Sequence, residues 1–101
     1  MERSDLDQIK VQKVRAEIDG VDNQILKLLQ QRFRLSKKMG MLKKKMQLMI
    51  LDRKREMQIY QRLAKNAKGS HLDLHLITGI WKYILKKSYQ IQRQVINDKS
   101  S

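Results

Sequence analysis

The stretch VRAEIDGVDNQILKLLQQRFRLSKKMGMLKKKM, residues 14–46, decides the fold. Alternating steps of four and three residues along it meet ten positions, of which nine are apolar and one is an arginine. These positions are Val14, Ile18, Val21, Ile25, Leu28, Arg32, Leu35, Met39, Leu42 and Met46. Such spacing aligns the apolar side chains along one face of a helix. The pattern therefore predicts a single helix from about residue 6 to about residue 47.

A helix of this length requires a partner chain. It would extend for about 60 Å, whereas a compact chain of about this size has a radius of gyration near ~13 Å. The rest of the chain cannot cover it, so we predict an obligate helical dimer. If the two long helices pair antiparallel, Arg15 of one chain approaches the middle of the other. An exposed Arg15 is the alternative at this point.

The remaining sequence predicts two shorter helices, at about residues 52–68 and 71–96. The chain contains no proline and only four glycines, so few residues interrupt helices. Gly69 is a good stop for the second helix. Ser70, with Asp73 three residues later, predicts a capping-box-like start for the third. We expect residues 1–101 to form one all-α domain of three helices.

The composition excludes several classes of protein. No cysteine is present, which removes disulfides, thiolate zinc sites and cysteine nucleophiles. No apolar run approaches the roughly 20 residues of a membrane span, and the charged N-terminal stretch does not resemble a signal peptide. We expect a soluble, cytoplasmic protein without a membrane partner. Its net charge of +13 favours binding of nucleic acid, anionic membranes or small anionic ligands.

One polar residue interrupts the apolar stripe of each predicted helix: Arg32, Glu56 and Ser88. A buried charge must be paired or must face a polar ligand. Lys43 lies eleven residues after Arg32, on nearly the same helix face. Two inward cations on one face suit a small anion. A buried ion pair between Arg32 and Glu56, which would fix the helix register, is the alternative.

Five short elements follow one another along the chain: Arg15-x-x-Ile18-x-x-x-Asp22, Gln31-Arg32, Gly40-x-x-Lys43, Asp52-x-x-Arg55-Glu56 and Ser88-x-x-x-Gln92. In this order and spacing they resemble the all-α (AroQ-type) chorismate mutases. Each element alone is weak, but together they form a specific signature. The resemblance implies an intertwined, antiparallel homodimer with two shared sites. It also implies rearrangement of chorismate to prephenate, on the route to phenylalanine and tyrosine.

The resemblance also implies roles for individual residues. Arg32 and the partner's Arg15 would hold the two carboxylates of chorismate. Lys43 and Gln92 would hydrogen-bond the ether oxygen of the C–O bond that breaks. A dianionic substrate suits inward arginines, and a donor at the ether oxygen stabilises charge that develops there.

The rest of the implied pocket lies on the second and third predicted helices. Glu56 would receive the substrate hydroxyl near the backbone of Asp52, and Arg55 and Ser88 would complete the wall. We expect no cofactor, because the rearrangement is unimolecular and needs only conformational control and charge stabilisation. We also expect no metal site, since the His71 and His75 pair lacks a third ligand.

Two other functions compete with this interpretation. A basic helical nucleic-acid-binding protein would use the lysines of residues 37–45, but only five residues are aromatic and no reading helix stands out. An isochorismate-pyruvate lyase of the same fold is a nearer rival. The element Asp52-x-x-Arg55-Glu56, together with Ser88, favours the mutase over this lyase. Family members often carry a proline before the second helix, and the proline-free residues 46–50 depart from that pattern.

Overall fold

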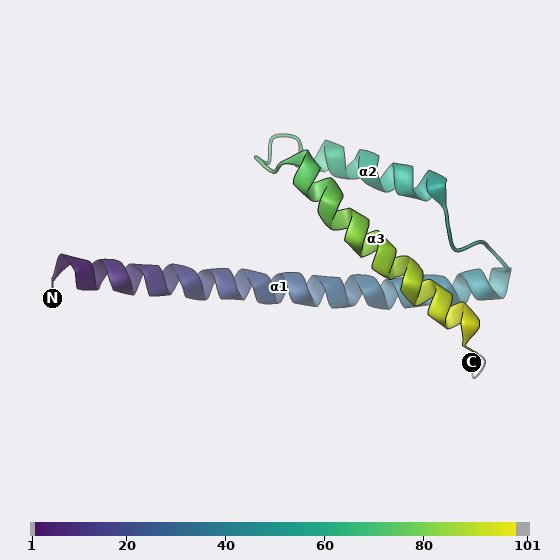
Figure 1. Ribbon diagram of the computed structural model, residues 1–101, viewed down its shortest axis with the longest axis horizontal. Helices are drawn as coiled ribbons and strands as arrows, with labels where there is room; N and C mark the ends of the chain where they lie inside the picture. Colours follow the sequence, from purple (N-terminus) through teal and green to yellow (C-terminus); the bar gives the residue numbers. More distant parts are fainter. Residues whose placement is uncertain (1, 99–101) are drawn as a thin grey trace. The chain divides into compact units, whose positions relative to one another are not determined.

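The computed structural model describes residues 2–98, which form three α-helices and no strand (Figure 1). Helix α1 spans Arg3–Met46, α2 spans Arg53–Ala67 and α3 spans Leu74–Asn97. The predicted all-α class is therefore confirmed. Within this part of the chain, no helix is both long enough and apolar enough to cross a membrane.

Local backbone geometry explains where α1 and α2 end. Helix α1 stops at Met46 because Gln47 adopts a φ of 56°, in the left-handed region. Helix α2 stops at Ala67, and Gly69 follows with a φ of 80°. Glycine reaches this conformation without a steric penalty. The expected stop at Gly69 is confirmed.

The predicted capping-box start of the third helix at Ser70 is wrong. Asp73 is the N-cap of α3, and its carboxylate accepts a hydrogen bond of 2.9 Å from the backbone N–H of His75. Ser70 instead donates its hydroxyl proton to the carbonyl of Ala67, at the end of α2. The serine is therefore used to close the preceding helix, and α3 begins only at Leu74.

The chain divides into two compact units, residues 1–32 and residues 33–101. Apart from Glu2, the described part of the first unit consists of α1 residues, and their apolar stripe is about half exposed. The exposed fraction is 52% at Val14, 53% at Ile18, 50% at Ile25 and 62% at Leu28. A stripe of this kind is typical of a helix surface that packs against another element.

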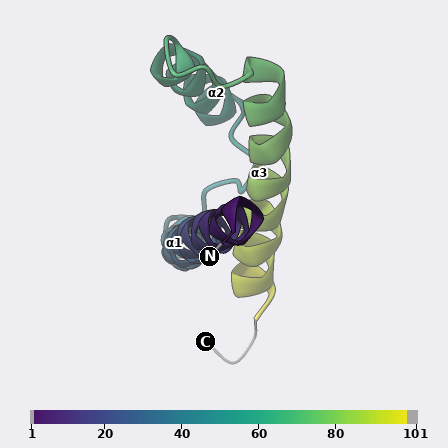
Figure 2. The same ribbon diagram turned by 90° about the vertical axis from the view of Figure 1, so that its left-hand side faces the viewer.

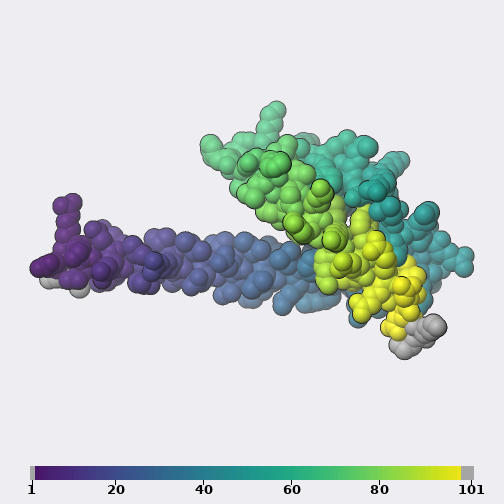
Figure 3. Space-filling view, viewed as in Figure 1, coloured from purple at the N-terminus to yellow at the C-terminus, as the bar shows by residue number. Residues whose placement is uncertain are grey.

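In the second unit, α2 and α3 pack against each other (Figure 2). In the space-filling view of Figure 3, the surfaces of the two helices adjoin each other. The small buried apolar core of the second unit consists of Ile59 of α2 and Ile77 and Leu85 of α3.

The last turns of α1 contact α3 through small residues that do not belong to the apolar stripe. Ser36 and Gly40 are buried, whereas Leu35 and Leu42 on the stripe are 60% and 51% exposed. A Cβ added at Gly40 would lie 3.0 Å from Cα of Gln92 and 3.3 Å from Cβ of Val95. Because Cα of Gln92 belongs to the backbone of α3, it cannot move aside as a flexible side chain can. Glycine at position 40 therefore permits the close approach of the two helices.

We expect Gly40→Ala to lower the free energy of unfolding by ~1–3 kcal/mol, because the added methyl group overpacks the contact. Gly79→Ala is the matched control, since position 79 lies in the interior of α3 with nothing within 4 Å of an added Cβ. This control should gain about 0.5–1 kcal/mol from helix propensity. Urea denaturation followed by circular dichroism, at one fixed protein concentration, measures both. A Gly40→Ala variant as stable as the parent would contradict the close contact.

Candidate functional site

Lys43 lies in the last turn of α1 and holds the segment that follows it. Its ammonium Nζ donates a hydrogen bond to the carbonyl of Ile50, and its own carbonyl accepts one of 2.8 Å from the N–H of Leu48. These two bonds order the proline-free segment before α2. Burial lowers the pKa of Lys43, and the negative charge of Asp52 acts in the opposite direction. The carboxylate of Asp52 therefore favours the charged form of Lys43.

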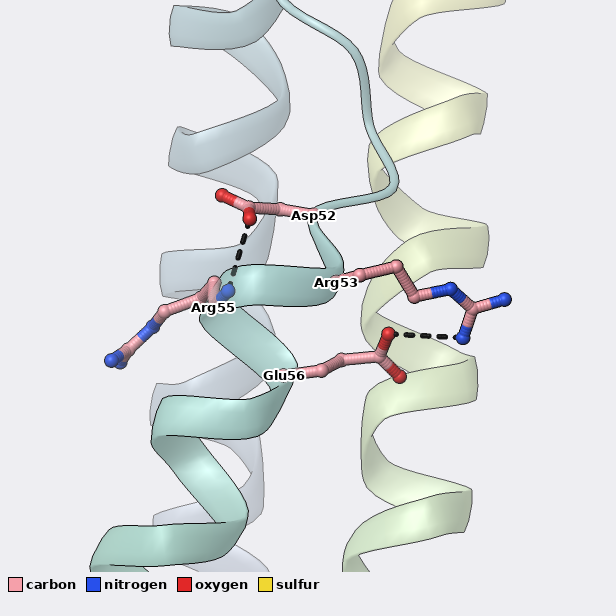
Figure 4. A network of polar contacts seen from close by, with 4 residues as sticks. All are labelled: Asp52, Arg53, Arg55 and Glu56. Atoms are coloured by element: carbon pink, nitrogen blue, oxygen red, sulfur yellow. Dashed lines mark hydrogen bonds and ion pairs between the residues drawn. The ribbon is translucent and has the colours of Figure 1, made fainter.

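Three of the predicted site residues lie at the N-terminal end of α2, shown in Figure 4. Asp52 is the N-cap, and its Oδ1 accepts a hydrogen bond of 3.0 Å from the backbone N–H of Arg55. The carboxylate of Glu56 pairs with the guanidinium of Arg53 at 3.2 Å. The side chain of Arg55 is exposed and points away from this pair (Figure 4).

The two predicted site residues of α3 are buried against the end of α1. Ser88 is 4% exposed, and its Oγ accepts a hydrogen bond of 3.0 Å from Oγ of Ser36. Gln92 is 6% exposed and contacts Gly40. Its Oε1 is buried, and no described residue donates a hydrogen bond to it. A buried amide oxygen without a donor calls for a ligand, a water or a partner chain.

Ser36 is a site neighbour that the sequence analysis missed. It lies four residues after Arg32 and four before Gly40, so all three share one helix face. That spacing was a usable signal. The apolar pattern of α1 does not include these positions, because serine and glycine are not large hydrophobic residues.

Tyr89 was also missed, although it neighbours Ser88 in the sequence. Burial raises the pKa of the Tyr89 hydroxyl, and the negative charge of Glu56 raises it further. Tyr89, Glu56 and Leu85 line a groove of about 300 Å³ between α2 and α3. The same groove is lined by four cationic side chains, Arg53, Lys82, Lys86 and Arg93. A lining that is mainly positive favours anions.

The structure thus brings several predicted residues into the second unit and onto adjoining turns. Lys43 lies one turn beyond Gly40, whose backbone contacts Gln92. Asp52 is close enough to Lys43 to influence its pKa, and Glu56 follows one turn later on α2. Arg15 and Arg32 lie on the part of α1 that belongs to the first unit, where Arg15 is exposed and Arg32 is half-buried.

Comparison with known proteins identifies the family of the chain. The sequence profile of chorismate mutase type II matches residues 14–93. The chain is 30% identical over 89 residues to a chorismate mutase of Methanocaldococcus jannaschii, which covers 88% of this chain and 90% of that relative. It is 29% identical over 89 residues to a bifunctional chorismate mutase/prephenate dehydratase of Aquifex aeolicus, which covers 85% of this chain but 25% of that relative. No solved structure gives a significant match.

The fold and the matched segment together define the class: an all-α protein with polar residues buried between its helices. The chain belongs to the chorismate mutase type II family.

The electrostatic effect of Asp52 on Lys43 leads to a titration prediction. A lysine with a lowered pKa loses its proton at a lower pH than an ordinary lysine, so its ammonium form disappears first as the pH rises. Asp52→Asn removes the charge that raises the pKa of Lys43. We therefore expect the variant to lower this pKa further, while asparagine still caps α2. NMR titration of the lysine side-chain carbons measures the effect.

Asp73→Asn is the control for this titration, because it makes the same chemical change at the N-cap of α3. It should leave the pKa of Lys43 where it is in the parent. An unchanged pKa of Lys43 in Asp52→Asn would show that the carboxylate of Asp52 does not act on it.

Proposed function

We propose that this chain catalyses the rearrangement of chorismate to prephenate. The observation that carries the proposal is the family match over residues 14–93, which spans every residue assigned to the substrate. Because chorismate is a water-soluble dianion, we place the reaction in the cytoplasm.

The reaction requires no covalent bond between the substrate and the protein. One C–O bond breaks and one C–C bond forms within the same molecule, so no group is transferred to a side chain. The protein accelerates such a step by holding the compact reactive conformer and by stabilising the charge that develops on the ether oxygen. Arg32 and the partner's Arg15 perform the first task by binding the two carboxylates.

Lys43 and Gln92 perform the second task at the ether oxygen. An ammonium carries three N–H donors, so the hydrogen bond from Lys43 to Ile50 leaves donors for the substrate. Partial burial strengthens the attraction between this cation and the developing negative charge. Gln92 is buried beside the same turns of α1 and donates without changing its protonation state.

The remaining residues orient the substrate. Glu56 accepts a hydrogen bond from the substrate hydroxyl near the backbone of Asp52. Ser88 lines the carboxylate end, and its hydrogen bond with Ser36 supports this orientation. Arg55 is exposed, so a change of rotamer brings its guanidinium toward the substrate.

We further propose that two chains form an intertwined, antiparallel homodimer with two shared sites. The half-exposed apolar stripe supports this, because it extends through both units of α1: Leu28 is 62% exposed in the first and Met46 is 62% exposed in the second. A second copy of the chain provides an apolar surface of matching length. Antiparallel pairing delivers the partner's Arg15 to the site.

The direct test is conversion of chorismate by the parent protein and by Arg32→Ala and Lys43→Ala. Removing either cation should lower kcat/KM by about 100-fold or more, the usual effect of losing one charge-stabilising donor. Arg34→Ala and Lys45→Ala are matched controls, since both side chains are exposed neighbours on α1. Ultraviolet absorbance follows the loss of chorismate, and circular dichroism checks folding.

Two outcomes would contradict this proposal. Near-parent activity in Arg32→Ala or Lys43→Ala would show that the replaced cation does not have the role proposed for it. Release of pyruvate from isochorismate, without conversion of chorismate by the parent, would assign the chain to the lyase instead.

Mixing two inactive variants tests the shared site. A heterodimer of Arg15→Ala with Arg32→Ala retains one intact site, because both substitutions fall together in the other. After denaturation and refolding of an equal mixture, we expect about a quarter of the parent's activity to return, since random pairing leaves one site in four intact. Activity no higher than that of the separate variants would contradict an Arg15 that acts across the dimer.

A further inference from the structure

The C-terminal end of α3 is bound by a cation from α1. The last carbonyl groups of a helix lack donors within the helix and form the negative end of its dipole. Lys44 donates from Nζ to the carbonyl of Asp98 at 2.9 Å, with a longer contact of 3.5 Å to the carbonyl of Val95. The backbone N–H of Asp98 also reaches the Val95 carbonyl, at 3.3 Å. Lys44 therefore caps α3 from a different helix.

This cap lies next to the residues assigned to the ether oxygen. Lys44 follows Lys43 directly, and it lies one turn after Gly40. Val95 lies one turn after Gln92. A Cβ at Gly40 would meet both Gln92 and Val95. Gly40 thus contacts the turn of α3 that carries Gln92, and Lys44, one turn later on α1, binds the turn of α3 that follows it.

We propose that Lys44 is a positioning residue, which keeps the last turns of α3 docked on α1 and thereby sets the position of the Gln92 amide relative to the Lys43 ammonium. The proposal rests on the proposed function, in which these two groups meet the ether oxygen. Without the cap, the end of α3 frays as unsupported helix ends do. A displacement of about 1 Å in a catalytic group costs up to ~100-fold in rate.

The chain contains a matched control one residue away. Lys45 lines the same hollow as Lys44, Val95 and Asp98, and it carries the same charge. Lys45 is exposed, and within residues 2–98 it makes no hydrogen bond to the end of α3. Replacing either lysine by methionine removes one positive charge at nearly the same place. Any general effect of charge on attraction of the dianionic substrate is therefore common to both variants.

The kinetic experiment compares Lys44→Met, Lys44→Arg and Lys45→Met with the parent. We expect Lys44→Met to lower kcat/KM by about 5- to 50-fold through misplacement of Gln92. Lys44→Arg should restore most of the activity, because a guanidinium also donates to carbonyl oxygens. Lys45→Met should stay within about twofold of the parent. Equal losses in Lys44→Met and Lys45→Met would overturn the proposal.

A double-mutant cycle with Gln92→Ala separates positioning from a merely structural role. If Lys44 acts through Gln92, the double variant Lys44→Met/Gln92→Ala should have the same kcat/KM as Gln92→Ala alone. Losses that multiply would show that Lys44 acts by another route, and they would overturn the proposal.

Amide hydrogen exchange tests the cap without reference to chorismate. Residues 92–97 should exchange faster in Lys44→Met than in the parent or in Lys45→Met. Unchanged exchange would overturn the cap. Faster exchange in Lys44→Met, together with a parent that leaves chorismate unconverted, would overturn the proposed function and leave the cap intact.

Discussion

The second unit of this protein depends on the close approach of α1 and α3 at Gly40. Three residues of α1, spaced four apart, meet α3 on successive turns: Ser36 at Ser88, Gly40 at Gln92, and Lys44 at the helix end. The middle contact is the tightest, because the backbone of α3 occupies the place of a side chain. The hydrogen bonds on either side of it require that separation. The absence of a Cβ at position 40 therefore allows the separation of the helices at which these polar contacts form.

This interface is polar where most helix contacts are apolar. Burying hydroxyl and amide groups is favourable only when they find partners. Ser36 and Ser88 satisfy each other, whereas Oε1 of Gln92 has no donor among residues 2–98. The contact surface of α1 and α3 is thus also a wall of the candidate site. The unpaired Oε1 calls for a donor, whereas the proposed hydrogen bond from Gln92 to the ether oxygen uses its amide N–H groups.

Two consecutive lysines of α1 bind different segments of the chain. Neighbouring side chains on a helix point about 100° apart. Lys43 consequently donates a hydrogen bond to the segment before α2, where the charge of Asp52 acts to raise its pKa. Lys44 instead donates to the end of α3. The net charge of +13 therefore contains cations with distinct structural tasks, in addition to those exposed on the surface.

The sequence by itself determined the helical class, the long first helix, the glycine stop at Gly69 and the family, because periodicity, turn residues and motif spacing are local properties. It misplaced the start of α3 at Ser70, whose hydroxyl bonds to Ala67. Only the tertiary structure decided that Ser36 and Gly40, rather than Leu35 and Met39, face α3. The physical reason is that the closest packing of two helices selects small side chains, whereas hydrophobic periodicity detects large ones. The positions of Lys44 and Tyr89 likewise depend on which turns of separate helices meet, and no spacing within one helix contains that information.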